Sequence, residues 1–230
     1  MTTPGVRKDA NRGNIVNKDI LHTNPTEIKE HRKQTKSSGS HKDKSTLSPS
    51  SSSSSSLIEK IRQSNFHDHD IMIYPDLPTF RQVYSQATKE ALERNEIVFL
   101  GTTYDSFQRV IDSLTHVGVS VIKESKDGNL HILDSVKAYQ LDTFGAFKFA
   151  QSLVMRAAKD GKAGVFNISD LGSFFVADSI PALLEYERSL PKKVDLEFKG
   201  VCAYHKGDFA NLSKEQQEII LSAHNRIMAA

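Results

Sequence analysis

From Phe66 to the C-terminus, short apolar runs alternate with longer segments that have the periodicity of amphipathic helices. This alternation constrains the fold more than any other feature of the chain. Helical segments of about 13 to 18 residues between strands imply right-handed crossovers and a mainly parallel sheet. We therefore predict a three-layer α/β/α sandwich over residues 66–230. Four runs have the content of buried strands: Ile71–Tyr74, Ile97–Leu100, Gly164–Ile168 and Phe198–Tyr204.

Local signals refine this pattern. Asp76 precedes an apolar stripe of helical spacing, and Ser213, with Gln three residues later, has the spacing of a capping box. Both predict helix starts, and the final stripe is expected to run through His224. Val119–Lys123 and Asn129–Leu133 flank Asp127-Gly128, a strong tight-turn signal that predicts a hairpin.

Residues 1–65 have a different composition. They are rich in Ser, Lys, Asn and Thr, and Ser50–Ser56 is a low-complexity run. Residues 1–64 carry 12 Lys/Arg against 6 Asp/Glu, whereas residues 65–230 carry 18 against 22. Such a segment buries too little apolar area to offset its ordering entropy, so we predict a disordered basic tail with a short helical turn at Leu57–Arg62. The tail could serve solubility alone, or make weak contacts with nucleic acid or an acidic partner.

The compartment is expected to be the cytoplasm. Cys202 is the only cysteine, so no intramolecular disulfide can form. No run of about 18 apolar residues occurs, which predicts no membrane span. Met1–Lys18 is basic but has no apolar core of a secretory signal.

In open α/β sheets, ligands bind outside the carboxyl ends of the strands. This rule predicts a binding rim made of residues that are far apart in sequence. The alternative is that these residues are helix caps and turn formers, which favour the same places. The candidate ligand-binding residues are Tyr74, Thr102, Thr103, Tyr104, Asp134, Asp170 and His205, with Asp76, Ser169 and Asp208 nearby.

The strand-to-helix junction Gly101–Ser106 argues against ATP hydrolysis. A phosphate-binding loop needs several glycines and a lysine. Here the junction holds one glycine, no lysine, and Asp105, whose charge would repel phosphate. We expect no cofactor and no catalytic residue.

Three histidine or cysteine patterns could suggest a metal, and each has a plainer interpretation. Cys202 and His205 are three residues apart on a strand, so they point to opposite faces, and Cys202 is expected to be a buried small hydrophobe. His224 is expected to be a hydrogen-bonded core histidine. His67–Asp70 supplies two histidines on one side but no further ligands. The sequence therefore predicts no metal site.

The order and spacing of several segments resemble those of the methanogen/methylotroph sensory (MEDS) domain over roughly residues 67–228. The segments are His69–Tyr74, Asn95–Tyr104, Leu130–Asp134, Ala138-Tyr139, Leu183–Glu187, Val201–His205 and Asp208-Phe209. The resemblance implies a RecA/KaiC-like core that has lost its phosphate-binding loop, and a sensory role beside a DNA-binding or histidine-kinase module. This chain shows no such module, so its output would pass through a partner or the tail.

The preferred hypothesis is a stand-alone sensory or regulatory domain that binds a small ligand or a signalling or transcription protein. A nucleic-acid-associated protein acting through residues 1–64 is the second hypothesis, and steep salt dependence of binding would distinguish it. A nucleotide-binding or enzymatic protein using the rim is the third, and turnover or tight ATP binding would distinguish that one.

Overall fold

The computed structural model of the protein describes residues 51–136 and 145–230. Within them, one six-stranded sheet forms, in which every strand pairs in parallel with its neighbours. The spatial order is β3-β2-β4-β5-β1-β6, and the expected parallel sheet is confirmed. The strands are β1 (His69–Tyr74), β2 (Ile97–Thr102), β3 (Leu130–Asp134), β4 (Val165–Asp170), β5 (Phe198–His205) and β6 (Ile227–Ala229).

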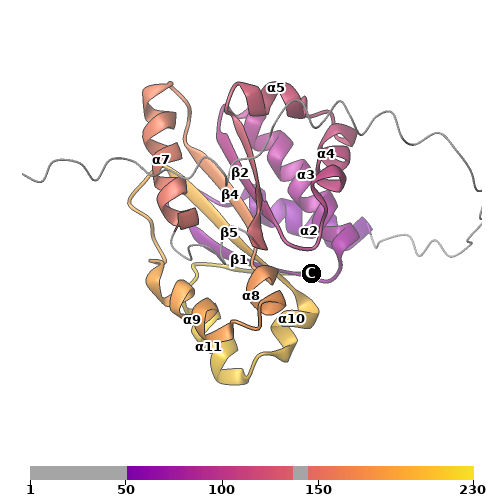
Figure 1. The fold of residues 1–230 in the computed structure, drawn as a ribbon, viewed down its shortest axis with the longest axis vertical. Helices are drawn as coiled ribbons and strands as arrows, with labels where there is room; N and C mark the ends of the chain where they lie inside the picture. The colour runs from indigo at the N-terminus through magenta and orange to yellow at the C-terminus, as the bar shows by residue number, and fades with distance from the viewer. Residues whose placement is uncertain (1–50, 137–144) are drawn as a thin grey trace, which may run out of the picture.

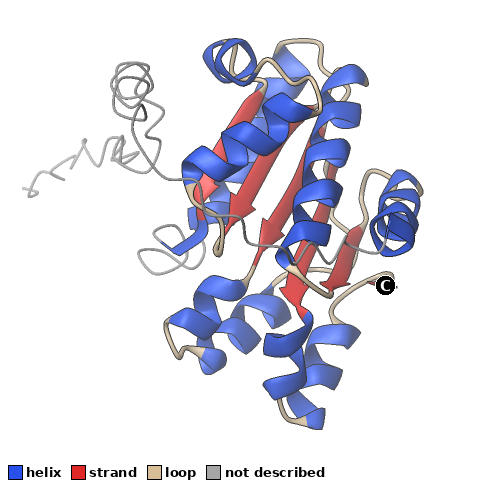
Figure 2. Cartoon of the chain, turned by 90° about the vertical axis from the view of Figure 1, so that its right-hand side faces the viewer, coloured by secondary structure: helices blue, strands red, loops and turns tan. Residues whose placement is uncertain are grey.

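Helices lie on both faces of this sheet (Figures 1 and 2). One face is covered by α2 (Ser51–Arg62), α3 (Leu77–Glu93) and α4 (Phe107–His116), with α5 (Val121–Lys126) beside α4. The other elements are α7 (Gly145–Lys159), α8 (Gly172–Val176), α9 (Ile180–Ser189), α10 (Lys206–Asn211) and α11 (Lys214–Ser222). Of these, α7 packs on the second face, whereas α8 to α11 gather toward the carboxyl ends of the strands.

Alternate strand residues bury into two separate apolar cores. Met72 and Phe166 pack with α2, α3 and α4, whereas Ile71 and Val165 pack with α7, α8 and α9. This is the two-residue period of a strand that is covered on both faces. The two cores establish the three-layer α/β/α architecture.

The expected helix starts at both ends of the domain are confirmed. Asp76 Oδ1 accepts a hydrogen bond from Thr79 N at 2.7 Å and caps α3. Ser213 and Gln216 form a reciprocal capping box at the start of α11. Each satisfies backbone N–H groups that the first turn of a helix leaves without partners.

The predicted hairpin around Asp127-Gly128 is wrong. The turn exists, with Gly128 at φ 71°, but it joins a helix to a strand. Val121–Lys126 is α5, and Leu130–Asp134 pairs in parallel with β2. Parallel pairing with the edge of the buried sheet places Leu130 and Leu133 in the two cores, which a surface hairpin could not do.

The folded region begins earlier than residue 66. In place of a short turn at Leu57–Arg62, α2 runs from Ser51 and buries Leu57 and Ile61 against α3. These two side chains give the serine-rich helix an apolar edge. Residues 1–50, which hold most of the expected tail, lie outside the described residues, as do Ala138 and Tyr139.

The C-terminus also departs from expectation. The final helix ends at Ser222, and His224 lies in the turn that follows it. Asn225 N donates to His69 O at 2.7 Å and Ile71 N donates to Arg226 O at 3.0 Å, so the chain becomes a sixth strand beside β1. Among the described residues, no helix combines the length and apolarity needed to cross a membrane.

Candidate functional site

The carboxyl ends of four strands lie side by side, because the sheet order contains β2-β4-β5-β1. Parallel strands end at the same edge of a sheet, where the connections to the following helices leave room for ligands. Polar and aromatic residues collect at this edge. The rim cluster comprises Tyr74, Thr103, Tyr104, Asp170, His205 and Asp208.

The floor of the rim cluster is a buried hydrogen-bonded group. Tyr74 Oη donates to Asp170 Oδ2 at 3.1 Å, and the backbone N–H of Gly172 donates to Asp170 Oδ1 at 2.9 Å. Thr103 Oγ1 donates to the backbone carbonyl of Asp170 at 3.1 Å. Tyr74 and Asp170 are completely buried, so they orient their neighbours and offer no surface to a ligand.

The outer part of the cluster is half-buried. Tyr104 Oη donates to Asp208 Oδ2 at 2.6 Å, which links the loop after β2 to α10. The His205 ring lies 5.5 Å from the Tyr74 ring and 6.4 Å from the Tyr104 ring, centroid to centroid. A Cβ at Gly172 would collide with the Tyr104 ring, so glycine permits this close approach. Phenol, imidazole and carboxylate groups thus meet solvent together.

Burial governs the charge of this cluster. It raises the pKa of Asp170 to about 7, and the hydrogen bonds from Gly172 and Tyr74 only partly oppose that rise. Burial also raises the pKa of Tyr74 and Tyr104 above the usual value for phenols. Both phenols therefore remain hydrogen-bond donors at neutral pH, and Asp170 titrates close to it.

Most of the predicted rim residues converge, and two do not. The five that converge lie at the ends of four strands: Tyr74, Thr103, Tyr104, Asp170 and His205. Thr102 ends β2 and is buried in the sheet. Asp134 is exposed at the end of the edge strand β3, opposite Thr102, and β2 separates it from β4 and the rest of the cluster.

The junction after β2 holds its acidic residue away from the rim. Arg81 Nε donates to Asp105 Oδ1 at 2.9 Å, and Tyr84 Oη donates to Asp105 Oδ2 at 3.2 Å. The Asp105 side chain is 2% exposed and faces α3. Its charge is therefore neutralised by Arg81, and the argument against a phosphate loop rests on the missing lysine and glycines.

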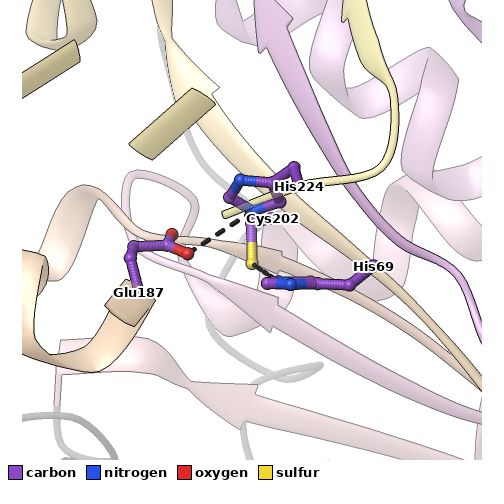
Figure 3. Close-up of side chains that lie close together, drawn as sticks. All are labelled: His69, Glu187, Cys202 and His224. Atoms are coloured by element: carbon purple, nitrogen blue, oxygen red, sulfur yellow. Dashed lines mark hydrogen bonds and ion pairs between the residues drawn. The ribbon is translucent and has the colours of Figure 1, made fainter. Parts of the chain in front are cut away.

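A second polar cluster lies inside the molecule. Figure 3 shows the buried tetrad, which comprises His69, Glu187, Cys202 and His224. One ligand atom from each lies within 4.8 Å of those of the other three. His69 Nε2 is 3.2 Å from Cys202 Sγ, and His224 Nε2 is 3.4 Å from Glu187 Oε2. Tyr204 Oη donates to the other carboxyl oxygen, Glu187 Oε1.

Sequence reasoning considered His69, Cys202 and His224 separately, and it missed both Glu187 and the meeting of the four side chains. Cys202 is buried, as predicted, and it does not share a site with His205, which belongs to the rim. His224 is a buried histidine, but on a turn and not on a helix. Glu187 was detectable, because it follows Leu183 by four residues on the buried stripe of α9, where a carboxyl group is unusual.

A small cavity of about 30 Å³ adjoins the tetrad. Apart from His69 and Cys202, its walls are mostly apolar, with Phe99, Tyr186 and Phe198 among them. This volume has room for about two water molecules. It is far smaller than the pockets that hold drug-sized ligands.

Comparisons with known proteins agree with the fold. The model of the family described as "MEDS: MEthanogen/methylotroph, DcmR Sensory domain" matches residues 68–225. Curated proteins gave no match. Among solved structures, the chain is similar to uncharacterized protein PH0321 from Pyrococcus horikoshii, solved in complex with an unknown peptide. The TM-score is 0.55 at 12% identity, covering 75% of this chain and 81% of that one. A likeness at this identity shows the fold alone.

Proposed function

The chain belongs to the MEDS family of sensory domains, and from this membership we propose that it senses a small ligand or a protein segment that binds at the rim cluster. The bound state would act on signal transduction or transcription through a partner protein. We propose binding without turnover. The rim residues supply hydrogen-bonding groups, and the junction Gly101–Ser106 is not a phosphate-binding loop.

The observation that carries this proposal is the convergence at the rim. Tyr104, His205 and Asp208 come from the loop after β2, the end of β5 and α10, yet they meet above the buried Tyr74–Asp170 pair. Small-molecule sites combine a few oriented polar groups with apolar walls. The half-exposed groups supply the contacts, and the buried pair holds them in place.

We include a protein segment among the two proposed kinds of ligand because of a solved structure with a similar fold. The Pyrococcus horikoshii protein of similar fold was solved with an unknown peptide. Short segments and small ligands both suit a rim of donors and acceptors. The mass of the ligand that stays bound to the purified protein distinguishes a peptide segment from a small molecule.

Native mass spectrometry of the full chain, purified from its own cells, tests the proposal. We expect the unmodified protein to retain an additional mass that the His205→Ala and Tyr104→Phe variants lose. His116→Ala changes an exposed histidine at the end of α4 and serves as the matched control. Retention that is equal in all four proteins would place the ligand elsewhere.

A further inference from the structure

We propose that His69, Glu187, Cys202 and His224 bind one zinc ion, which cross-links the sheet to α9 and to the turn after α11. This metal site is separate from the rim cluster and does not depend on the sensory role of the rim. Its ligands come from four segments of the chain that lie up to about 155 residues apart.

The strand register brings the first two ligands together. In the parallel pair β1–β5, Ile71 lies opposite Cys202 and His69 lies opposite Gly200. Residues two apart on a strand share a face, so His69 and Cys202 project from the same side of the sheet.

The other two ligands reach this point from above the sheet. Glu187 is on the buried stripe of α9, and His224 lies in the turn between α11 and β6. The hydrogen bond from Asn225 N to His69 O holds that turn against β1. The His69 and His224 rings consequently lie 4.2 Å apart, centroid to centroid.

The spacing suits a four-coordinate ion. Zinc bonds of about 2.0 Å to nitrogen or oxygen and about 2.3 Å to sulfur give a tetrahedron with edges of about 3.3–3.5 Å. The His69–Cys202 and His224–Glu187 distances, 3.2 and 3.4 Å, are already close to such edges. The separations extend up to 4.8 Å, which requires a contraction of up to about 1.5 Å.

A hydrogen bond orients His224 as a ligand. Its Nδ1 lies 2.7 Å from the carbonyl oxygen of Ile220, and a carbonyl can only accept, so Nδ1 carries the proton. Metal-bound histidines typically donate their second nitrogen in this way. Nε2 then presents a lone pair to Glu187 Oε2. Within the described residues, neither atom has a hydrogen-bond partner, and both side chains are 0% exposed.

The charges also match a divalent cation. Zinc takes histidine ligands in their neutral form and cysteine as thiolate. Cys202 and Glu187 are buried, where an isolated negative charge is unfavourable. A thiolate and a carboxylate around Zn²⁺ give zero net charge. Binding of the ion releases the thiol proton of Cys202 to solvent.

The donor set selects the metal. One sulfur, two imidazole nitrogens and one carboxylate oxygen suit zinc, whereas magnesium and calcium prefer oxygen alone. Four protein ligands with no open position are typical of a structural site. Tyr204 holds Glu187 Oε1 and leaves Oε2 for the ion.

Cobalt spectroscopy on the full chain tests this site. Cys202 is the only cysteine, so a thiolate-to-cobalt charge-transfer band can arise only from it, even though residues 1–50 contain further histidines. We expect this band on addition of Co²⁺, visible bands of tetrahedral intensity, and their loss on titration with one equivalent of Zn²⁺. Absence of the charge-transfer band would overturn the proposal.

Variants provide the second measurement. Loss of a residue that only hydrogen-bonds to a metal ligand typically lowers metal affinity by about 10–100-fold. Glu187 is a direct ligand in this proposal, so Glu187→Gln should weaken Zn²⁺ binding by at least about a hundredfold in a chelator competition. Cys202→Ser should abolish the charge-transfer band, and His116→Gln should change neither result. Zinc affinity that is unchanged in Glu187→Gln and Cys202→Ser would also overturn the site. If a variant fails to fold, the cobalt spectrum of the unmodified chain still decides.

Discussion

Strands β1 and β5 each contribute to both polar clusters, and the two clusters differ in their exposure to solvent. β1 begins with His69 in the buried tetrad and ends with Tyr74 in the rim cluster. β5 carries Cys202 in the tetrad and ends with His205 at the rim. Along one strand, therefore, the distance from a sealed site to an open one is three to five residues.

The difference between the clusters indicates their roles. Every member of the tetrad is less than 5% exposed, so its polar atoms must be satisfied from within the protein or by an ion. At the rim, Tyr104, His205 and Asp208 are partly exposed and can exchange water for a ligand. The tetrad is suited to hold the fold together, and the rim is suited to bind molecules that come and go.

The largest expected effect is at the tetrad. Tyr204 is fully buried and donates to Glu187, so Tyr204→Ala leaves a cavity and an unpartnered carboxyl oxygen. We expect the free energy of unfolding to fall by about 3–5 kcal/mol. Urea unfolding measures it. A loss below about 1 kcal/mol would show that the interior of this region is not tightly packed.

The floor of the rim should respond to pH. Because burial raises the folded-state pKa of Asp170 to about 7 from 3.8, the folded chain keeps a proton that the unfolded chain loses as pH rises from 4 to 7. The free energy of unfolding therefore falls over this range by up to about 1.4 kcal/mol per pH unit and levels off above pH 7. Asp170→Asn removes this proton and should remove this contribution to the fall.

Urea unfolding of both proteins at pH 5, 6 and 7 measures that effect. Tyr74 and Asp208, the neighbours of Asp170, are the same in both proteins. We expect the stability advantage of the unmodified protein over Asp170→Asn to shrink steadily from pH 5 to pH 7. A constant difference would mean that Asp170 is ionised throughout, and that the floor of the rim carries a charge.

The open side of the rim should matter little for stability. Tyr104→Phe removes one hydrogen bond to Asp208 from a half-exposed position, for which we expect a loss of about 0.5–1.5 kcal/mol. Thermal unfolding checks this value. A loss as large as that of Tyr204→Ala would erase the contrast between the two clusters and make Tyr104 a core residue.

The smallest expected effect is that of ATP. Gly101–Ser106 has one glycine and no lysine, so millimolar ATP with magnesium should leave the melting temperature unchanged. ADP and magnesium alone are the controls. A rise equivalent to about 2.7 kcal/mol, the stabilisation at a hundredfold excess of ligand over Kd, would contradict this account.

The rim was predictable from sequence, because two general rules place it. Apolar runs separated by helices imply parallel strands, and parallel strands end at one edge. Tyr104 and His205 follow from these rules without knowledge of any contact. Asp134 did not join them, because the strand order, which periodicity does not encode, places β3 at the far edge.

The tetrad was not predictable in the same way. It depends on the register of β1 against β5, on the exact end of α11 and on a sixth strand of three residues. The apolar stripe through Ile220 and Ile227 indicated a longer helix, but pairing with β1 ended it at Ser222. Tertiary pairing decided the position of His224, and local propensity did not.

Hydrogen exchange of the full chain tests the sensory role of the rim most directly. The protein would be measured with and without the small-molecule and peptide fraction of its own cells. We expect slower amide exchange in residues 103–105 and 205–208, and no change in α4 and α5. Protection confined to α4, α5 or another outer helix face, with the rim unaffected, would contradict the account.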